Sequence, residues 1–399
     1  MTYSRRGLFG IIGKAAGSAA SAVGLDPPRQ PAGKTNAPIA PPEALPSESE
    51  REKAARESAL DLLEGTGPEY GGGLSNHGPM AADALVVMGR SEAVVPWLER
   101  YRRGLDAAPT LRRSIGAGDW SEALGRYDRV GDWTAFFRRE LLERPWTEVV
   151  SIWCERLAPG ISAAAFHGVL RAAYAARTMR RAESPARGRE LAEGLAYWAA
   201  RYRRLAERPT HKHAETLRSP SEVLNTLESL PASHRAGGLI DEQLEALRDL
   251  PSFSRVADLV DTSSDPSVFL TRVTEAFADA CLAHATRASA IAWVHTVTGP
   301  SAVRLLLPHV NPATARSLAR YAWQGAAGIH AAFSLPVPRL DRRQEDRADD
   351  LVDRAVRTGD EHAFKFVETC LREYGIAPRP VYLSAARGML DFLSHPART

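Results

Sequence analysis

Residues 162–180 read SAAAFHGVLRAAYAARTMR, and this stretch gives the clearest indication of the fold. Alanine, leucine and arginine, which are good helix formers, dominate it, and apolar residues recur at three- and four-residue spacing. The stretch predicts a very apolar helix that carries one histidine, His167. It therefore points both to a helical fold and to a polar group inside that fold.

The same spacing of apolar residues recurs along most of the chain. It predicts helices over residues 51–64, 80–104, 132–157, 162–180, 189–206, 267–298, 312–333, 347–357 and 361–374. Alternating strand-like runs are scarce, and Val381–Leu383 is the best of them. Residues 206–266 are more polar and are expected to connect an N-terminal and a C-terminal half. We therefore predict an all-α protein: one large helical domain of two sub-bundles over residues 51–395, preceded by a flexible N-terminal segment.

Composition excludes several broad classes. The 399 residues are 44% hydrophobic and 25% charged, which is ordinary for a globular protein and excludes a wholly disordered chain. The 51 basic and 48 acidic residues nearly balance, so we expect no nucleic-acid partner. The sequence contains no run of 18 apolar residues, so we expect no integral membrane segment. The three cysteines are widely spaced and predict neither a disulfide framework nor a thiolate zinc site.

The N-terminal 50 residues have a different character. Arg5 and Arg6 precede a mildly apolar, Gly/Ala-rich stretch that ends near Gly24, and this resembles a twin-arginine export signal. A Pro/Ala-rich linker follows it, up to about residue 48. The other interpretation is a flexible tail whose paired arginines carry no signal. Localisation is therefore left open between the cytoplasm and export by the twin-arginine route.

No nucleotide-binding motif stands out. The glycines between Gly65 and Gly73 lack the preceding strand and the spacing of a dinucleotide fingerprint. A P-loop, a G-x-S-x-G elbow and an H-E-x-x-H motif are also missing from the sequence. A Rossmann-type flavin or NAD enzyme is thus disfavoured, and a metal is the more natural carrier of any redox reaction.

Three histidines lie in apolar contexts. His77 precedes Gly78 and Pro79 at the start of a predicted helix, His167 lies within one, and His295 is expected to end another. A buried imidazole needs partners for both ring nitrogens, and a metal together with a hydrogen-bond acceptor would supply them. The structural alternatives are a turn histidine at 77, a core histidine bonded to a backbone carbonyl at 167, and a histidine favoured by the helix dipole at 295.

His362 and Lys365 form the most specific pair. Asp360 is expected to cap a new helix, which places these two residues on one face in its first two turns. Only five of the 51 basic residues are lysines, and Lys365 is flanked by Phe364 and Phe366. Burial would lower its pKa, and a neutral amine can take up carbon dioxide as a carbamate, which is an anionic oxygen ligand. The alternative is a lysine that extends to solvent beside a surface histidine.

Several imidazoles and one hard oxygen donor suit iron(II) above all, with zinc, copper or manganese as further options. Helical bundles build such sites at their centre, from side chains on facing helices. His330 is a reserve ligand. The aromatic residues next to these positions are candidates for a substrate pocket: Phe166, Trp293, Trp323 and Phe364.

Short blocks around these residues resemble a known family. They occur in the order found in the questin oxidase-like proteins and extend over roughly residues 55–390. The blocks are Asn76–Ala81, Phe166–Arg171, Val294–Pro300, Leu305–His309, Trp323–Gln324 and Glu361–Lys365.

The resemblance implies oxidative opening of a ring in aromatic polyketides or quinones. One version is a non-haem iron(II) oxygenase that cleaves a C–C bond with O2 and holds its iron through histidines and a carboxylated lysine. By resemblance, the iron ligands would be His77, His167, His295, His362 and Lys365. Another version is an NADPH-dependent Baeyer–Villiger oxidase without a Rossmann fingerprint. A non-catalytic helical binding protein is the third hypothesis, and the missing nucleotide motif favours the iron version.

Overall fold

A computed structural model describes residues 47–205, 217–231, 233, 238–336, 339–340 and 347–394. The described chain is helical except for loops, isolated bridges and one short antiparallel hairpin, in which β1 (Glu69–Tyr70) pairs with β2 (Leu74–Ser75). The all-α prediction is therefore confirmed. The expected flexible segment, with its paired arginines and its linker up to residue 46, lies outside the described residues.

The N-terminal half of the described chain contains eight α-helices. They are α1 (Glu50–Leu63), α2 (Gly78–Val87), α3 (Ser91–Tyr101), α4 (Trp120–Ala123), α5 (Val130–Glu143), α6 (Trp146–Leu157), α7 (His167–Arg181) and α8 (Pro185–Arg201). Those of the C-terminal half are α9 (Pro220–Leu224), α10 (Ile240–Glu245), α11 (Pro266–His284), α12 (Ala290–Leu306), α13 (Pro312–Phe333), α14 (Ala348–Thr358), α15 (Glu361–Ile376) and α16 (Pro380–Leu393).

Three long predicted helices are each two helices. The 80–104 pattern breaks where Gly89 takes a positive φ of 72°, and the 132–157 pattern breaks at Pro145. The 267–298 pattern breaks between α11 and α12. Apolar spacing continues across these breaks because both helices of each pair bury residues in the same core.

Two further expectations are wrong. The strand-like run Val381–Leu383 lies in α16, where Val381 and Tyr382 fill the buried face of the helix. His295 does not end its helix, since α12 continues to Leu306 with Pro300 inside it. The residues beyond His295 are buried as well, so packing carries the helix past the proline.

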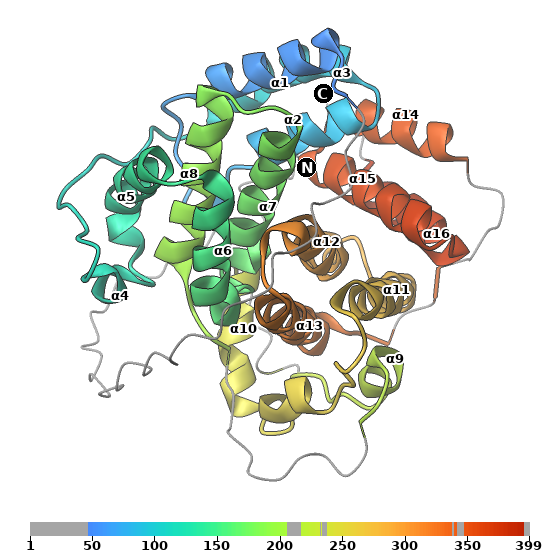
Figure 1. Ribbon diagram of the computed structural model, residues 1–399. Helices are drawn as coiled ribbons and strands as arrows, with labels where there is room; N and C mark the ends of the chain where they lie inside the picture. The colour runs from blue at the N-terminus through green and yellow to red at the C-terminus, as the bar shows by residue number, and fades with distance from the viewer. Residues whose placement is uncertain are drawn as a thin grey trace.

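The two halves meet where α7 packs against α12 (Figure 1). On its other side α7 packs closely against α8, and glycines permit the close approach: a Cβ on Gly168 would lie 2.5 Å from Trp198 Cα, and one on Gly194 would lie 2.7 Å from Ala172 N. Helices α11, α12 and α13 lie side by side, and α15 lies against α2, α12 and α16. One hydrophobic core spans both halves, so the sub-bundles form one helical body.

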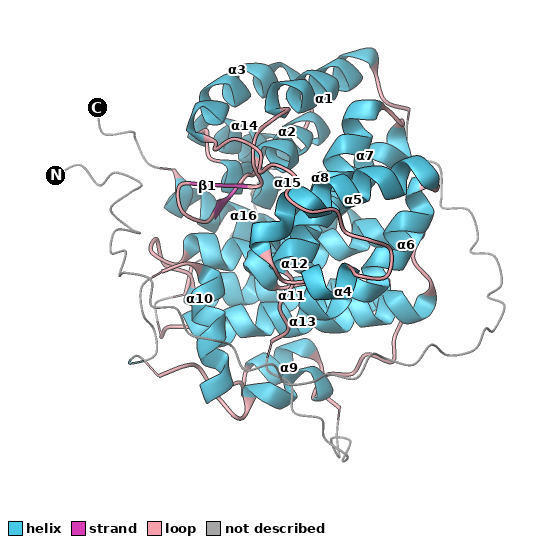
Figure 2. Ribbon diagram, turned by 90° about the vertical axis from the view of Figure 1, so that its left-hand side faces the viewer, coloured by secondary structure: helices cyan, strands magenta, loops and turns pink. Residues whose placement is uncertain are grey.

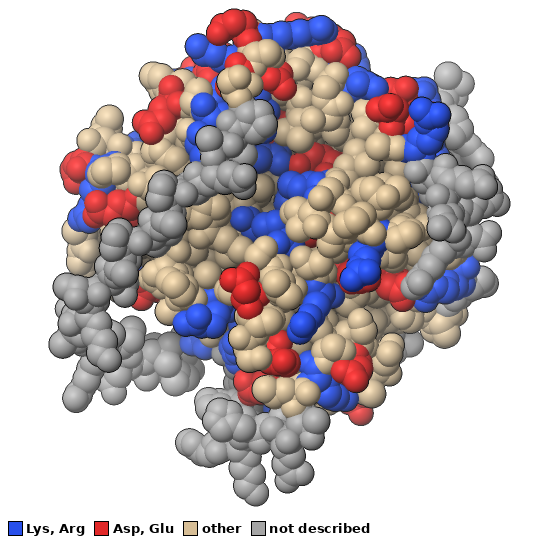
Figure 3. Space-filling view, turned by 45° about the vertical axis from the view of Figure 1, so that its right-hand side comes forward, with Lys and Arg blue, Asp and Glu red and all other residues tan. Residues whose placement is uncertain are grey.

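The surface of this body is mixed in charge. Figure 2 shows the hairpin at one edge of the helices. On the face shown in Figure 3, basic and acidic side chains occur in small groups among neutral residues. Among the described helices, none combines the length and apolarity that a membrane span requires.

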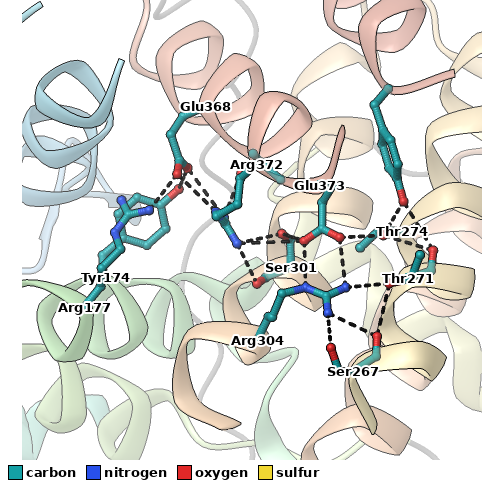
Figure 4. Close-up of polar contacts among 12 residues, drawn as sticks. Tyr174, Arg177, Ser267, Thr271, Thr274, Ser301, Arg304, Glu368, Arg372 and Glu373 are labelled. Carbon is teal, nitrogen blue, oxygen red and sulfur yellow. Dashed lines mark hydrogen bonds and ion pairs between the residues drawn. The ribbon is translucent and has the colours of Figure 1, made fainter. Parts of the chain in front are cut away.

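Buried ion pairs join α2, α7 and α15. Arg177 of α7 donates from Nε to Asp83 Oδ2 at 2.8 Å. It also donates from Nη1 to Glu368 Oε1 at 2.6 Å, and Tyr174 donates to Glu368 Oε2 at 2.8 Å (Figure 4). Burial by itself would raise the pKa of Glu368, but Arg177 and Arg372 lower it to about 2. Glu368 is therefore a buried carboxylate ion held by two guanidinium groups.

The same network continues from α15 to α12. Arg372 donates from Nε to Glu368 Oε1 at 3.1 Å and from Nη1 to Ser301 Oγ at 3.0 Å. Arg304 of α12 in turn donates to Glu373 Oε2 at 3.0 Å (Figure 4). We refer to Asp83, Arg177, Glu368, Arg372, Glu373 and Arg304 as the buried charge network.

Removing one charge from the buried charge network should lower the stability of the fold. We expect Glu368→Gln to lower the free energy of unfolding by about 3–5 kcal/mol, because it removes the buried carboxylate that Arg177 and Arg372 share and leaves Arg177 with Asp83 alone. The matched control is Asp353→Asn, since Asp353 is half exposed and pairs with Arg90 at 2.7 Å on the surface. That change should cost no more than about 1 kcal/mol. Urea denaturation followed by circular dichroism measures both, and equal losses would contradict the expectation.

Candidate metal centre

Three histidine rings from three helices meet in the interior. His77 immediately precedes α2, His167 is the first residue of α7, and His295 lies within α12. The Nε2 atom of His167 lies 2.8 Å from Nε2 of His77 and 3.0 Å from Nε2 of His295. All three side chains are buried, and we call them the histidine triad. Residues far apart in the sequence therefore present one nitrogen each to a common point.

Hydrogen bonds fix the tautomer of two triad rings. His167 Nδ1 lies 2.5 Å from the Ala164 carbonyl oxygen, and His295 Nδ1 lies 2.6 Å from that of Ile291. A carbonyl oxygen can only accept, so each Nδ1 carries the hydrogen and each Nε2 of a neutral ring has a bare lone pair. Two bare lone pairs 3.0 Å apart repel each other unless a cation lies between them.

His77 does not remove this conflict. Its Nδ1 has no hydrogen-bond partner among the described residues, and its Nε2 can donate one hydrogen to His167 at most. His295 would still face the other rings with a bare nitrogen. The donor set therefore fits a metal ion, which would satisfy all three Nε2 atoms together.

The electrostatics keep the triad uncharged. Burial lowers the pKa of His77, His167 and His295 well below 6.5, and repulsion from neighbouring imidazoles and from Lys365 lowers it further. Neutral imidazole is the form that binds a metal. At neutral pH the rings thus need no deprotonation before they coordinate.

His362 lies beside the triad. The carboxylate of Asp360 caps α15 by accepting from His362 N at 2.8 Å, as the sequence predicts, and it also lies 3.1 Å from His362 Nδ1. The ring centre of His362 is 4.5 Å from that of His77 and 5.7 Å from that of His295. With Nδ1–H directed at a carboxylate, Nε2 of this fourth imidazole is available for a ligand.

Lys365 is fully buried, and its Nζ has no hydrogen-bond partner among the described residues. The interpretation of a lysine that extends to solvent is therefore wrong. Burial lowers its pKa to about 7, against the opposing effect of Glu361 and Asp360. Its positive charge also helps to lower the pKa of His77 and His167. A buried amine without a hydrogen-bond partner among the described residues fits a site that can hold a further polar group.

The entry into α7 differs from the prediction. The helix expected over 162–180 begins at His167, because Ala164, Ala165 and Phe166 take positive φ values of 50°, 52° and 69°. This left-handed conformation costs about 1–2 kcal/mol per residue with a side chain. We call residues 163–166 the left-handed turn. Its carbonyl at Ala164 is the acceptor for His167, and no feature of an alanine run could have shown this.

The reserve ligand lies elsewhere. His330 packs against Trp293 and His284, with ring centres 5.7 and 5.3 Å apart, and lines a separate cavity of about 550 Å³.

Beside His362, sequence reasoning missed Glu361, a buried carboxylate whose oxygen is 3.9 Å from His362 Nδ1. Its place next to a capping aspartate was the only available signal.

The four aromatic residues expected to form a pocket wall do not share ring contacts. Each packs in a different place: Phe166 against Gly299 and Gly325, Phe364 against Trp97, Trp293 against His284 and His330, and Trp323 against Phe277. The shared pocket wall therefore stays a prediction, since adjacency to a ligand in sequence does not set the direction of a side chain on a helix.

The buried neutral histidines make stability depend on pH. Below about pH 6.5 the unfolded chain takes up protons that the folded, metal-free protein excludes, so the free energy of unfolding falls as the pH falls. Each such histidine adds up to about 1.4 kcal/mol per pH unit. We expect His295→Gln to make the free energy of unfolding depend less steeply on pH, by the contribution of one histidine. Urea denaturation at a series of pH values between neutrality and pH 5.5 tests this, and an unchanged slope would show that His295 is not kept neutral.

Comparison with known proteins identifies the family of this chain. The family described as Questin oxidase-like matches residues 91–370, a range that includes His167, His295, His362 and Lys365. A search of curated proteins found no match. The family takes its name from an oxidase, so membership suggests an oxidoreductase. Because the match covers well over half of the sequence, the chain belongs to the questin oxidase-like family.

Proposed function

We propose that this protein is a non-haem iron(II)-dependent oxygenase that opens a ring of an aromatic polyketide or quinone by C–C cleavage with O2. The observation that carries the proposal is the 3.0 Å approach of two bare Nε2 atoms, on His167 and His295, in a buried site. A protein without a metal gains nothing from this contact. Family membership supports the oxidative chemistry and the aromatic substrate class.

The proposed ligands are His77, His167, His295, His362 and Lys365. Imidazole nitrogens with a hard oxygen donor suit iron(II). When bound, iron supplies the one-electron chemistry that lets O2 react with a closed-shell organic substrate. The fixed Nδ1–H groups of His167, His295 and His362 hold their rings in the metal-binding tautomer before any metal arrives.

Lys365 would supply the oxygen donor as a carbamate. Its uncharged Nζ attacks the carbon of CO2, so that a nitrogen–carbon bond forms as one C=O π pair moves onto oxygen. The nitrogen then loses one proton to water, and an anionic carbamate remains. A pKa near 7 means that about half of the amine is uncharged at neutral pH. An arginine could not react in this way, because its guanidinium stays protonated.

Metal content gives the first test. We expect anaerobically purified protein to hold about one iron per chain and Lys365→Met to lose most of it, because methionine fills the same buried space without an amine. The control is Lys53→Met, which replaces an exposed lysine and should leave the metal content unchanged.

Other outcomes would support the other hypotheses. No metal in any preparation, with substrate-dependent NADPH oxidation, would replace the iron oxygenase by the Baeyer–Villiger oxidase. Metal content and O2 uptake that do not respond to His167→Ala or Lys365→Met would favour a non-catalytic binding protein. For the oxygenase, uptake of O2 with a hydroxyanthraquinone should require iron and give a ring-opened product.

The hydrogen bond from His362 to Asp360 allows a finer test. We expect Asp360→Asn to weaken metal binding about 10–100-fold, because an amide orients and polarises the imidazole less than a carboxylate does. Asparagine is as good a helix cap as aspartate, so stability should change little. Competition with a chelator of known affinity measures metal binding, and thermal unfolding of the metal-free protein is the control. An affinity equal to that of the wild type would exclude the role of the Asp360 carboxylate.

A further inference from the structure

The left-handed turn determines where the Ala164 carbonyl points. In a right-handed helix through residue 164, this carbonyl would be directed along the axis to the N–H of residue 168. The positive φ values at Ala164, Ala165 and Phe166 instead bring it to 2.5 Å from His167 Nδ1. In the turn the Ala164 carbonyl accepts from the His167 backbone N–H and also from His167 Nδ1, and the second contact fixes the tautomer of a proposed metal ligand.

Alanine and phenylalanine do not adopt this conformation unaided, so other residues must hold it. On one side, Phe166 is fully buried against Gly299 of α12 and Gly325 of α13. A Cβ added to these glycines would lie 2.6 and 2.5 Å from the Phe166 ring, so only glycine leaves space for it.

The other support comes from α10, far away in the sequence. Asp241 Oδ1 accepts from the Ala164 N–H at 3.1 Å, at the start of the left-handed residues. Arg203 forms an ion pair with Asp241 and also donates to its carbonyl oxygen at 3.1 Å. The same guanidinium pairs with Glu245, one turn further along α10. Of the two carboxylates that bind Arg203, Asp241 is therefore the one that reaches the turn.

We propose that Asp241 is a positioning residue of the metal centre: it holds the left-handed turn, and through the Ala164 carbonyl it keeps His167 in the Nδ1–H tautomer with Nε2 free for the metal. This inference rests on the proposed function, because the positioning role has a purpose only if the site binds a metal. Its primary readout, the tautomer of His167, requires no metal.

Four variants separate positioning from general stability. Asp241→Ala removes the acceptor, whereas Asp241→Asn keeps an oxygen that can accept from the Ala164 N–H. Glu245→Ala is the matched control, because it removes the other carboxylate that pairs with Arg203 and leaves the turn untouched. Asp241→Ala combined with Ala164→Gly and Ala165→Gly is a rescue, since glycine takes positive φ without strain.

The experiment measures ring ¹⁵N chemical shifts of histidine-labelled, metal-free protein above pH 7, where His167 is neutral. The resonances of His167 are assigned with a His167→Gln variant. We expect the Nδ1–H tautomer in the wild type, in Asp241→Asn and in Glu245→Ala. Asp241→Ala should show a mixture of tautomers, and the two glycines should restore most of the Nδ1–H form.

Binding of Co²⁺, followed by its visible absorption, is the second readout. We expect Asp241→Ala to bind about 10–100-fold more weakly than the wild type, and the asparagine variant to bind normally. An Asp241→Ala protein with the tautomer and the Co²⁺ affinity of the wild type would overturn the inference, as would equal losses in Glu245→Ala. A wild-type protein that fixes the tautomer of His167 but binds neither Co²⁺ nor iron would overturn the proposed function and leave the positioning role of Asp241 intact.

Discussion

The buried charge network is the constraint on which the geometry of the histidine triad depends. Asp83, Arg177, Glu368 and Arg304 lie on α2, α7, α15 and α12, and these are the helices that begin at or carry the proposed ligands. If one helix slid along its neighbour, a charge would lose its partner in the interior, at a cost of several kcal/mol. A core of alanine and leucine alone tolerates small shifts far better. The network therefore fixes how far each of the four helices is shifted along its neighbours. In this way it also fixes the point where the histidine rings meet.

The buried charge network and the candidate metal centre differ in how their buried polar groups are compensated. In the network each guanidinium faces a carboxylate, so burial is compensated pair by pair. At the candidate metal centre the triad imidazoles are neutral, and Lys365 Nζ has no hydrogen-bond partner in the part of the chain that the structure describes, so these polar groups are not compensated by a charge of opposite sign. The choice of residue follows from this. Arginine is the common basic residue of the chain and can only balance an acid, whereas lysine can lose its proton.

The sequence predicted those parts of the site that depend on neighbouring residues. The capping role of Asp360 and the shared face of His362 and Lys365 follow from local spacing, and the structure has both. Helix ends were less predictable, because apolar spacing runs across Gly89 and Pro145 wherever both flanking helices face one core. The meeting of residues 77, 167 and 295 depends on contacts between helices, which no single segment contains. Only the family resemblance had linked them.

Several local rules are broken close to the histidine triad. Alanines take left-handed angles directly before His167, a proline lies inside α12 shortly after His295, and a lysine is buried one turn after His362. Each of these costs stability by itself, and each persists because packed neighbours enforce it. Such exceptions are expected where a structure serves a function as well as stability. Their gathering around three facing Nε2 atoms argues that the interior of this helical body is shaped for a ligand.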